Sequence, residues 1–231
     1  MKKLCSLFVA ASMLLLVGCE IKYNGVAVQL NNECTYILDE ELLASLELSG
    51  GVDVVVDTAM AKNKVRVVSN TDDFSKLVVK AENGRLVISH KRNMGNKRIR
   101  IYIPSFGNIE YKAYVPACAY SAVAVAGGCD LEWNGCDVDK LAVTVSGGAD
   151  CEIKGRCNVL AVAVSGGADV DFDELVAGDV SVVASGGADA ELYAMRTISV
   201  VASGGADVYI SGTPQISDWS VSGGADVHIN K

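Results

Sequence analysis

Side chains that perform chemistry are scarce in this sequence. It has two histidines, His90 and His228, far apart in the chain, and no Gly-x-Ser-x-Gly, His-Glu-x-x-His or phosphate-loop motif. No Cys-x-x-Cys pair accompanies the histidines, so the spacings typical of zinc sites are missing as well. We therefore expect no catalytic residues, no cofactor and no metal centre of a common type.

Proline and aromatic residues are also rare, with three prolines and 6% aromatic residues, whereas apolar residues make up 50% of the chain. This apolar content excludes a disordered chain, and the abundance of Val and Ala is typical of a thin β stack. The formal net charge of −8 argues against nucleic acid as a partner. No proline lies in the segments before the repeated glycines, where it would remove a strand hydrogen bond.

A five-residue motif, Ser-Gly-Gly-Ala-Asp, recurs through the second half of the chain. A degenerate copy occupies 126–130, and unchanged copies occupy 146–150, 165–169, 185–189, 203–207 and 222–226. The copies start 18 to 20 residues apart, and a fixed period of this length indicates one structural coil stacked repeatedly on itself.

The segments before the motif alternate along the chain, as in Leu141–Val145 and Leu160–Val164. A period of two predicts strands, and the apolar i, i+3, i+4 stripe that a helical repeat would need is missing. We predict an all-β fold, a parallel β-helix with coils of about 19 residues.

The paired glycines mark the corners of this predicted coil. Glycine adopts positive φ without strain, so the pairs are expected where the chain turns sharply between strands. The predicted turn residues are Gly127, Gly128, Gly147, Gly148, Gly166, Gly167, Gly186, Gly187, Gly204, Gly205, Gly223 and Gly224.

An aspartate follows each glycine pair, and its carboxylate can bond turn amides, which is the structural explanation for its fixed place. The functional alternative is a cation ladder, because stacked strands bring equivalent carboxylates about 4.8 Å apart, where they repel by about 1 kcal/mol in water. Calcium is the minority interpretation, because the calcium-binding β-roll repeat is about half as long. The ladder would comprise Asp130, Asp150, Asp169, Asp189, Asp207 and Asp226.

The first residues have the pattern of an export signal, with Lys2 and Lys3 followed by an apolar stretch too short to span a membrane. The ending Leu16-Val17-Gly18-Cys19 resembles the bacterial lipobox, which implies cleavage before Cys19 and a lipid anchor on that residue. We divide the chain into a signal peptide (1–18), a lipidated linker (19–32) and a β-helix domain (33–231).

The lipobox resemblance also implies a compartment. Glu20 follows the cysteine in place of the Asp that commonly retains lipoproteins in the inner membrane of enterobacteria, so we expect a lipid-anchored outer-membrane protein. The sequence leaves open whether the domain faces the periplasm or the cell surface.

Upstream of the regular repeats, Ser49–Asp53 is similar to the motif, so coils are expected to begin there. Asn83-Gly84 predicts a tight turn, and 39–46 suggests a helical turn or a cap. Strands are predicted at 64–68, 76–81, 85–89 and 98–103.

Positive charge gathers before the repeats, since residues 76–112 hold nine Lys and Arg against two Glu. The simpler interpretation is the solvated side of a strand. The alternative is a basic patch for anionic glycans or lipid headgroups, formed by Lys91, Arg92, Lys97, Arg98 and Arg100.

Six cysteines follow Cys19, and export to an oxidising compartment allows disulfides. Cys136 and Cys157 follow their repeat aspartates by six and seven residues, so they should lie nearly over one another in adjacent coils, within reach of a bridge. Free cysteines acting as small core residues are the equal alternative. Exposed pairs such as Asp171 and Asp173 fit a glycosidase scheme only by analogy of fold.

The order of motifs resembles a bacterial family, the putative auto-transporter adhesin, head GIN domain, from about residue 33 onward. The resemblance rests on Leu48–Asp53, Leu77-Val-Val79, Asn83–Ile88, Ile99–Pro104 and the Ser-Gly-x-Ala/Gly-Asp-Val repeats. It implies a single-stranded right-handed β-helix on an envelope lipoprotein with no established enzymatic activity.

From these features we expect a non-enzymatic module that binds envelope polysaccharide or another envelope protein along a rigid β-helical surface. A purely structural or assembly role in the envelope is the alternative, and a carbohydrate-active enzyme is the third hypothesis. The sequence does not specify an oligomeric state.

Overall fold

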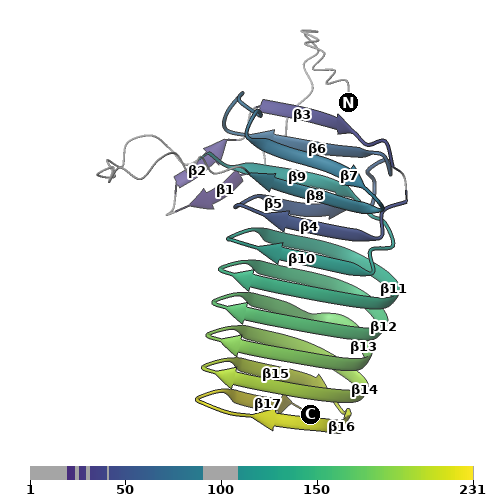
Figure 1. Ribbon diagram of the computed structural model, residues 1–231, viewed down its shortest axis with the longest axis vertical. Helices are drawn as coiled ribbons and strands as arrows, with labels where there is room; N and C mark the ends of the chain where they lie inside the picture. Colours follow the sequence, from purple (N-terminus) through teal and green to yellow (C-terminus); the bar gives the residue numbers. More distant parts are fainter. Residues whose placement is uncertain (1–19, 24–25, 30–31, 41, 91–108, 231) are drawn as a thin grey trace.

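The computed structural model describes residues 20–23, 26–29, 32–40, 42–90 and 109–230, and every regular element among them is a β-strand (Figure 1). Within these residues, no helix has the length and hydrophobicity needed to cross a bilayer. The strands are β1 Glu20–Tyr23, β2 Val26–Gln29, β3 Asn32–Ile37, β4 Ser45–Ser49, β5 Asp53–Asp57, β6 Lys64–Ser69, β7 Leu77–Glu82, β8 Arg85–His90, β9 Tyr111–Pro116, β10 Ala122–Ala126, β11 Asp130–Gly147, β12 Asp150–Gly166, β13 Asp169–Gly186, β14 Asp189–Gly204, β15 Asp207–Gly212, β16 Gln215–Val221 and β17 Asp226–Asn230.

The C-terminal half of the chain is a parallel β-helix, as predicted. Strands β11 to β14 pair with one another in parallel, and each runs along one wall of the coil, around a corner and back along the other wall (Figure 1). Each Ser-Gly-Gly-Ala-Asp motif connects the end of one coil to the start of the next. The predicted repeat is therefore the physical coil.

The interior of the coil is built from the alternation that the sequence shows. Inward residues such as Val143, Val162 and Val182 are almost completely buried, whereas their neighbours Ala142, Ala161 and Ser181 face solvent. Each inward residue lies directly over its equivalent in the next coil, so apolar side chains form continuous columns through the core, such as Leu131, Cys151 and Val170. A few large residues fill the wider places, including Phe172 and Leu192.

The chain turns sharply at the paired glycines, as predicted. The two glycines of a pair differ in backbone conformation. The first glycine of each complete motif has positive φ, for example +86° at Gly166 and +87° at Gly186, whereas the second does not. In the degenerate copy, both Gly127 and Gly128 have positive φ. A Cβ on Gly186 would lie 2.8 Å from the Gly166 carbonyl oxygen, so the corners stack too closely for a side chain at this position.

Ser49–Asp53 forms a coil corner of the same kind. Ser49 is in register with Ala126, and Val54 is in register with Leu131. The coils therefore begin at this motif, as predicted, although a long excursion of the chain separates it from the second coil.

The N-terminal part departs from the regular stack, because several of its pairings are antiparallel. Strand β6 pairs antiparallel with β3 and β9, and β7 pairs antiparallel with β8 through the turn at Asn83 and Gly84, both of which have positive φ. Three of the four strands predicted here are confirmed as β6, β7 and β8. The fourth, 98–103, lies outside the described residues.

The helical turn suggested for 39–46 is wrong. The described residues from Asp39 to Ala44 form no regular element, and Ser45 already begins strand β4. Leu46 and Leu48 are buried because β4 is held between β8 and β10, so a period of two prevailed over local helix propensity.

Candidate binding surface

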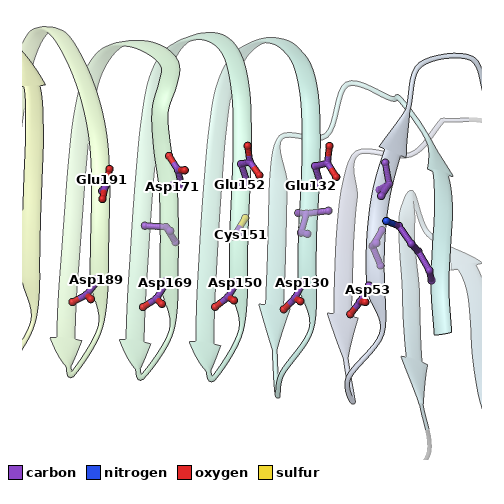
Figure 2. A pocket seen from close by; sticks show the side chains of 15 residues that line it. Asp53, Asp130, Glu132, Asp150, Cys151, Glu152, Asp169, Asp171, Asp189 and Glu191 are labelled. Carbon is purple, nitrogen blue, oxygen red and sulfur yellow. The ribbon is translucent and has the colours of Figure 1, made fainter. Parts of the chain in front are cut away.

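Two columns of carboxylates run along one wall of the solenoid, called here the acidic wall. The first column consists of the repeat aspartates, which pair in register from coil to coil (Figure 2). Its members are Asp130, Asp150, Asp169, Asp189, Asp207 and Asp226, preceded by Asp53 from the first coil. The alignment required for the proposed ladder is thus present.

The second column lies two residues further along each strand, on the same face. It consists of Glu132, Glu152, Asp171 and Glu191, which also pair in register (Figure 2). Sequence reasoning missed this column, although its signal was visible as an acidic residue two places after four of the repeat aspartates. Side chains two apart on a strand share a face, which places both columns on one surface.

The acidic wall differs in its charge compensation from the bend in the middle of β11 to β14, which lies opposite the glycine corners. This bend, which carries Asp137, Arg156, Asp179 and Arg196, is called the corner from here on. At the corner, Arg156 makes two hydrogen bonds to Asp137, at 2.9 and 2.7 Å, and Arg196 pairs with Asp179 at 2.8 Å. In the part of the chain that the structure describes, none of the six repeat aspartates has an ion-pair partner within 4 Å. On the second column, Lys154 pairs with Glu152 at 2.8 Å. The fold therefore neutralises its corner and leaves most of the wall anionic.

The crowding of like charges changes proton affinity. Burial, together with the neighbouring Asp53 and Asp150 carboxylates, raises the pKa of Asp130 to about 6. Burial and the Asp169 carboxylate raise the pKa of Asp150 in the same direction. Desolvation and like charge both disfavour the ionised form, so Asp130 and Asp150 hold their protons more tightly than isolated carboxylates would.

The acidic wall contains a shallow groove of about 660 Å³ that spans several coils. Lys112 lies at its N-terminal end, in register with Asp53, whose pKa is nevertheless raised because burial outweighs the attraction of the lysine. The groove is lined by both carboxylate columns from Asp53 to Asp189 and Glu191. An open, elongated groove of one charge suits an extended ligand better than a small molecule.

Three exposed carboxylates come together at the second column. Oxygen atoms of Asp171, Asp173 and Glu191 all lie within 4.8 Å of one another. Oxygen ligands of this kind suit Ca²⁺. This grouping includes two members of the second column, Asp171 and Glu191, and the corner residue Asp173, and none of the predicted ladder aspartates.

Asp171 and Asp173 do lie together, as the glycosidase scheme required. The backbone N–H of Asp173 donates to Asp171 Oδ1 at 3.4 Å, and burial is the main cause of a raised pKa at Asp171. Both side chains are exposed on the outer surface of the coil.

Cys136 and Cys157 lie at the corner, both buried, as neighbours of one another in adjacent coils. Cys136 is in register with Gly155 and Cys157 with Val138, so the two cysteines are offset by two positions along the strands and do not lie directly over one another. Burial, with a smaller contribution from Cys157, raises the pKa of Cys136 to about 12. Neither Cys136 nor Cys157 forms a disulfide in the structure, and both are buried. The bridge and the alternative role of core residues both stay predictions.

Cys129 has a separate structural role, at the position that Ala fills in the complete motifs. Its sulfur accepts hydrogen bonds from the backbone N–H groups of Gly51 and Val52, both at 3.3 Å. The thiol thereby joins the second coil to the corner of the first, across the excursion of the chain.

Two predicted features lie outside the described residues. These are the lipid-anchor residue Cys19 with its signal peptide, and the basic patch formed by Lys91, Arg92, Lys97, Arg98 and Arg100.

Solved structures with the same fold are found among bacterial adhesin-like proteins. A putative adhesin from Bacteroides fragilis aligns with a TM-score of 0.61 and 15% identity, covering 85% of this chain and 94% of its own. A putative adhesin from Parabacteroides distasonis aligns with a TM-score of 0.54 and 13% identity, covering 86% and 96%. At these identities the likeness establishes the fold alone.

The sequence comparisons give the family. Comparison with curated proteins yields no match. The family model described as putative auto-transporter adhesin, head GIN domain, matches residues 43–214, which include the first coil, the antiparallel excursion and most of the regular stack. The chain therefore belongs to the head GIN domain family of putative auto-transporter adhesins.

Proposed function

We propose that this protein is a lipid-anchored adhesin of the bacterial envelope that binds an extended polysaccharide along its acidic wall. The observation that carries the proposal is the pair of carboxylate columns, in which only Glu152 has an ion-pair partner among the described residues, whereas at the corner Asp137 and Asp179 are each paired with an arginine. Membership of an adhesin family supports a role in binding at the envelope or cell surface.

The geometry of the acidic wall suits a repeating partner. Carboxylates recur at the strand spacing of about 4.8 Å along the solenoid axis, so the four successive coils that start at Asp130, Asp150, Asp169 and Asp189 each offer a pair of acidic groups to the next unit of a polymer. Amino groups on the polysaccharide, or divalent cations that bridge to its acidic groups, would supply the missing positive charge. Many weak contacts along one chain add up to useful avidity.

The anchor places this surface at a membrane. Acyl chains on Cys19 would hold the protein to the outer membrane, because each buried methylene contributes about 0.8 kcal/mol. The support for this part is the lipobox-like Leu16–Cys19 sequence. Protease treatment of intact cells tests the location: loss of the domain places it on the cell surface, and protection places it in the periplasm.

A glycan array with the full chain carrying Cys19→Ser tests the binding function. The double variant Glu132→Gln/Asp171→Asn should lose most of the binding, because neither carboxylate has an ion-pair partner among the described residues, and binding should weaken as salt concentration rises. The matched control, Asp137→Asn/Asp139→Asn, removes the same charge from the corner and should bind like the wild type. Equal loss in both variants would mean that net charge, and not the acidic wall, determines binding. No binding to any glycan would favour the structural role in the envelope.

A further inference from the structure

The C-terminal end of the solenoid is open. Strand β16 is hydrogen-bonded to β14 and strand β17 to β15, and among the described residues neither has a partner on its outer side (Figure 1). The two strands belong to opposite walls of the same last coil. Unpaired edge strands are a ready template for pairing with another chain.

The apolar interior of this last coil is exposed. Ile216, Trp219 and Val221 occupy the inward positions of Ile198, Val200 and Ala202 in the coil above. They are 53%, 40% and 39% exposed, whereas the residues above them are at most 1% exposed. Val227 and Ile229 on β17 are only partly buried in the same way.

The N-terminal end is different. There the antiparallel strands β3 and β7 close the stack, and inward residues such as Val67 and Ile88 are completely buried. The apolar interior is therefore covered at the N-terminal end and exposed at the C-terminal end. An exposed apolar surface of this kind is typical of a protein–protein interface.

We propose that the open end binds a second copy of this chain through a two-fold axis perpendicular to the solenoid. Such an axis sets β17 antiparallel to β17 of the partner and brings the two exposed interiors together. The second copy offers the same pair of edge strands and the same apolar residues, so both walls and the core continue across the interface.

The charged residues of β17 favour an antiparallel second copy of the chain over a further parallel coil that continues the repeat. A further coil in register would place another aspartate beside Asp226 and extend the repulsion of the first column. In an antiparallel pair centred on Val227, Asp226 of each copy instead faces His228 of the other. The imidazole can donate a hydrogen bond to the carboxylate, and its stacking on Tyr209, with ring centroids 5.0 Å apart, already holds it on this face.

The dimer has a consequence that rests on the proposed lipid anchor. The two-fold axis reverses the direction of the solenoid, so the N-terminal ends lie at opposite ends of the dimer. Cys19 precedes Asn32, the first residue of β3, by 13 positions. Two anchored copies would therefore join two facing membranes, which is homophilic adhesion.

A symmetric cysteine tests the contact directly. Val227 faces its own copy in the proposed register, and both kinds of antiparallel pair place Cα atoms at a separation that a disulfide accepts. The full chain carrying Val227→Cys, in detergent with a mild oxidant, should migrate as a reducible dimer. The wild type and Ser181→Cys, which is exposed on the other wall, should remain monomeric on the gel.

A charge exchange tests the register. His228→Asp sets two pairs of carboxylates against each other and should weaken dimerisation at least about tenfold, measured by light scattering of the detergent-solubilised full chain. The exchange variant Asp226→His/His228→Asp restores opposite partners and should recover dimerisation to within about threefold. Trp219→Asp should give monomers by placing a charge in the shared core.

A monomeric wild type at all concentrations, or crosslinking by Ser181→Cys as strong as by Val227→Cys, would overturn the dimer. Dimerisation unaffected by both His228→Asp and Trp219→Asp would overturn the choice of interface. Neither result would contradict glycan binding along the acidic wall. Conversely, an absence of glycan binding would not contradict the dimer.

Discussion

The two walls of the solenoid are made by the same coils and yet differ completely in their outer residues. One is the acidic wall. The other, called here the uncharged wall, consists of 122–126, 141–146, 160–165, 180–185 and 198–203, and carries Ala, Ser, Thr and Val on its outer face. Both walls stack equally well, because the inward residues and the glycine corners suffice for stacking. Charge on one wall is therefore not demanded by the fold.

The difference between the two walls indicates that the acidic wall has a role beyond stacking. A column of like charges costs stability, so the small neutral residues of the uncharged wall are the less costly solution. Where the chain needs carboxylates at the corner, it supplies Arg156 and Arg196 beside them. The uncompensated charge of the acidic wall is the exception and calls for a partner outside the chain.

The largest effect is expected at the glycine corner that joins the two walls. Gly186→Ala combines a positive φ with a contact of 2.8 Å to a backbone oxygen, so we expect a loss of about 3 kcal/mol in the free energy of unfolding. Gly187→Ala is the matched control, because the φ of Gly187 is not positive and a Cβ there would lie 3.8 Å from its nearest atom, the Gly166 carbonyl oxygen. Urea unfolding measures both, and equal losses would contradict the proposed role of the first glycine.

The opposite corner tests the cysteine prediction. A Cys136–Cys157 bridge closes a loop of about 20 residues and would contribute about 3 kcal/mol by restricting the unfolded chain. Reduction should then lower the melting temperature, and the double variant Cys136→Ala/Cys157→Ala should be insensitive to reductant. Full alkylation of both thiols in protein isolated from the envelope would show instead that they are core residues.

Calcium distinguishes the acidic wall from the uncharged wall. The cation-ladder hypothesis predicts that Ca²⁺ at ten times its dissociation constant stabilises the fold by about 1.4 kcal/mol, seen as a higher melting temperature than in chelator. Asp150→Asn/Asp169→Asn removes two neighbouring carboxylates of the ladder and should reduce the shift. An unchanged melting temperature in the wild type would end the hypothesis.

The pH dependence of stability reports the crowding of the first column. The pKa of Asp130 is raised to about 6 in the folded state, so the folded protein holds more protons than the unfolded chain between about pH 4 and 6. Stability should therefore fall as pH rises through this window. Asp130→Asn should be more stable than the wild type at pH 7, by about 1 kcal/mol after solvent screening, and equal to it below pH 4.

The control for that sign is Asp137, whose pKa is lowered by its hydrogen bonds to Arg156. Asp137→Asn removes a favourable pair and should be slightly less stable than the wild type at pH 7. If both variants shift in the same direction, local compensation does not explain the difference between wall and corner.

The smallest effect is expected on the uncharged wall. Val183 is 46% exposed on the outer face, so Val183→Thr should change the free energy of unfolding by less than about 0.5 kcal/mol and leave glycan binding unchanged. A large loss of binding would move the functional surface to this wall.

Much of the fold followed from local pattern, because a repeat makes every coil an independent copy of the same evidence. The corners at Gly147, Gly166 and Gly186, the strands between them and the hairpin at Asn83-Gly84 were all predictable. The antiparallel pairings of β6 with β3 and β9 were not, since they join residues up to 48 positions apart without a repeat to mark them. The prediction of a helical turn for 39–46 was wrong for a related reason. The composition of this segment favours a helix, but strand β4, which begins at Ser45, pairs with β8 and β10, which are distant in sequence.

The candidate site divides in the same way. The period of the motif was enough to imply a column of aspartates, because identical coils that stack must superimpose identical residues. The chain alone did not reveal that Glu132, Glu152, Asp171 and Glu191 form a second column beside it, that the arginines serve the corner and leave the wall unpaired, or that the last coil exposes its core. Those features depend on which outward side chains of different coils lie within a few ångströms, and that is decided by register and by the closure of each end, which are properties of the assembled coil.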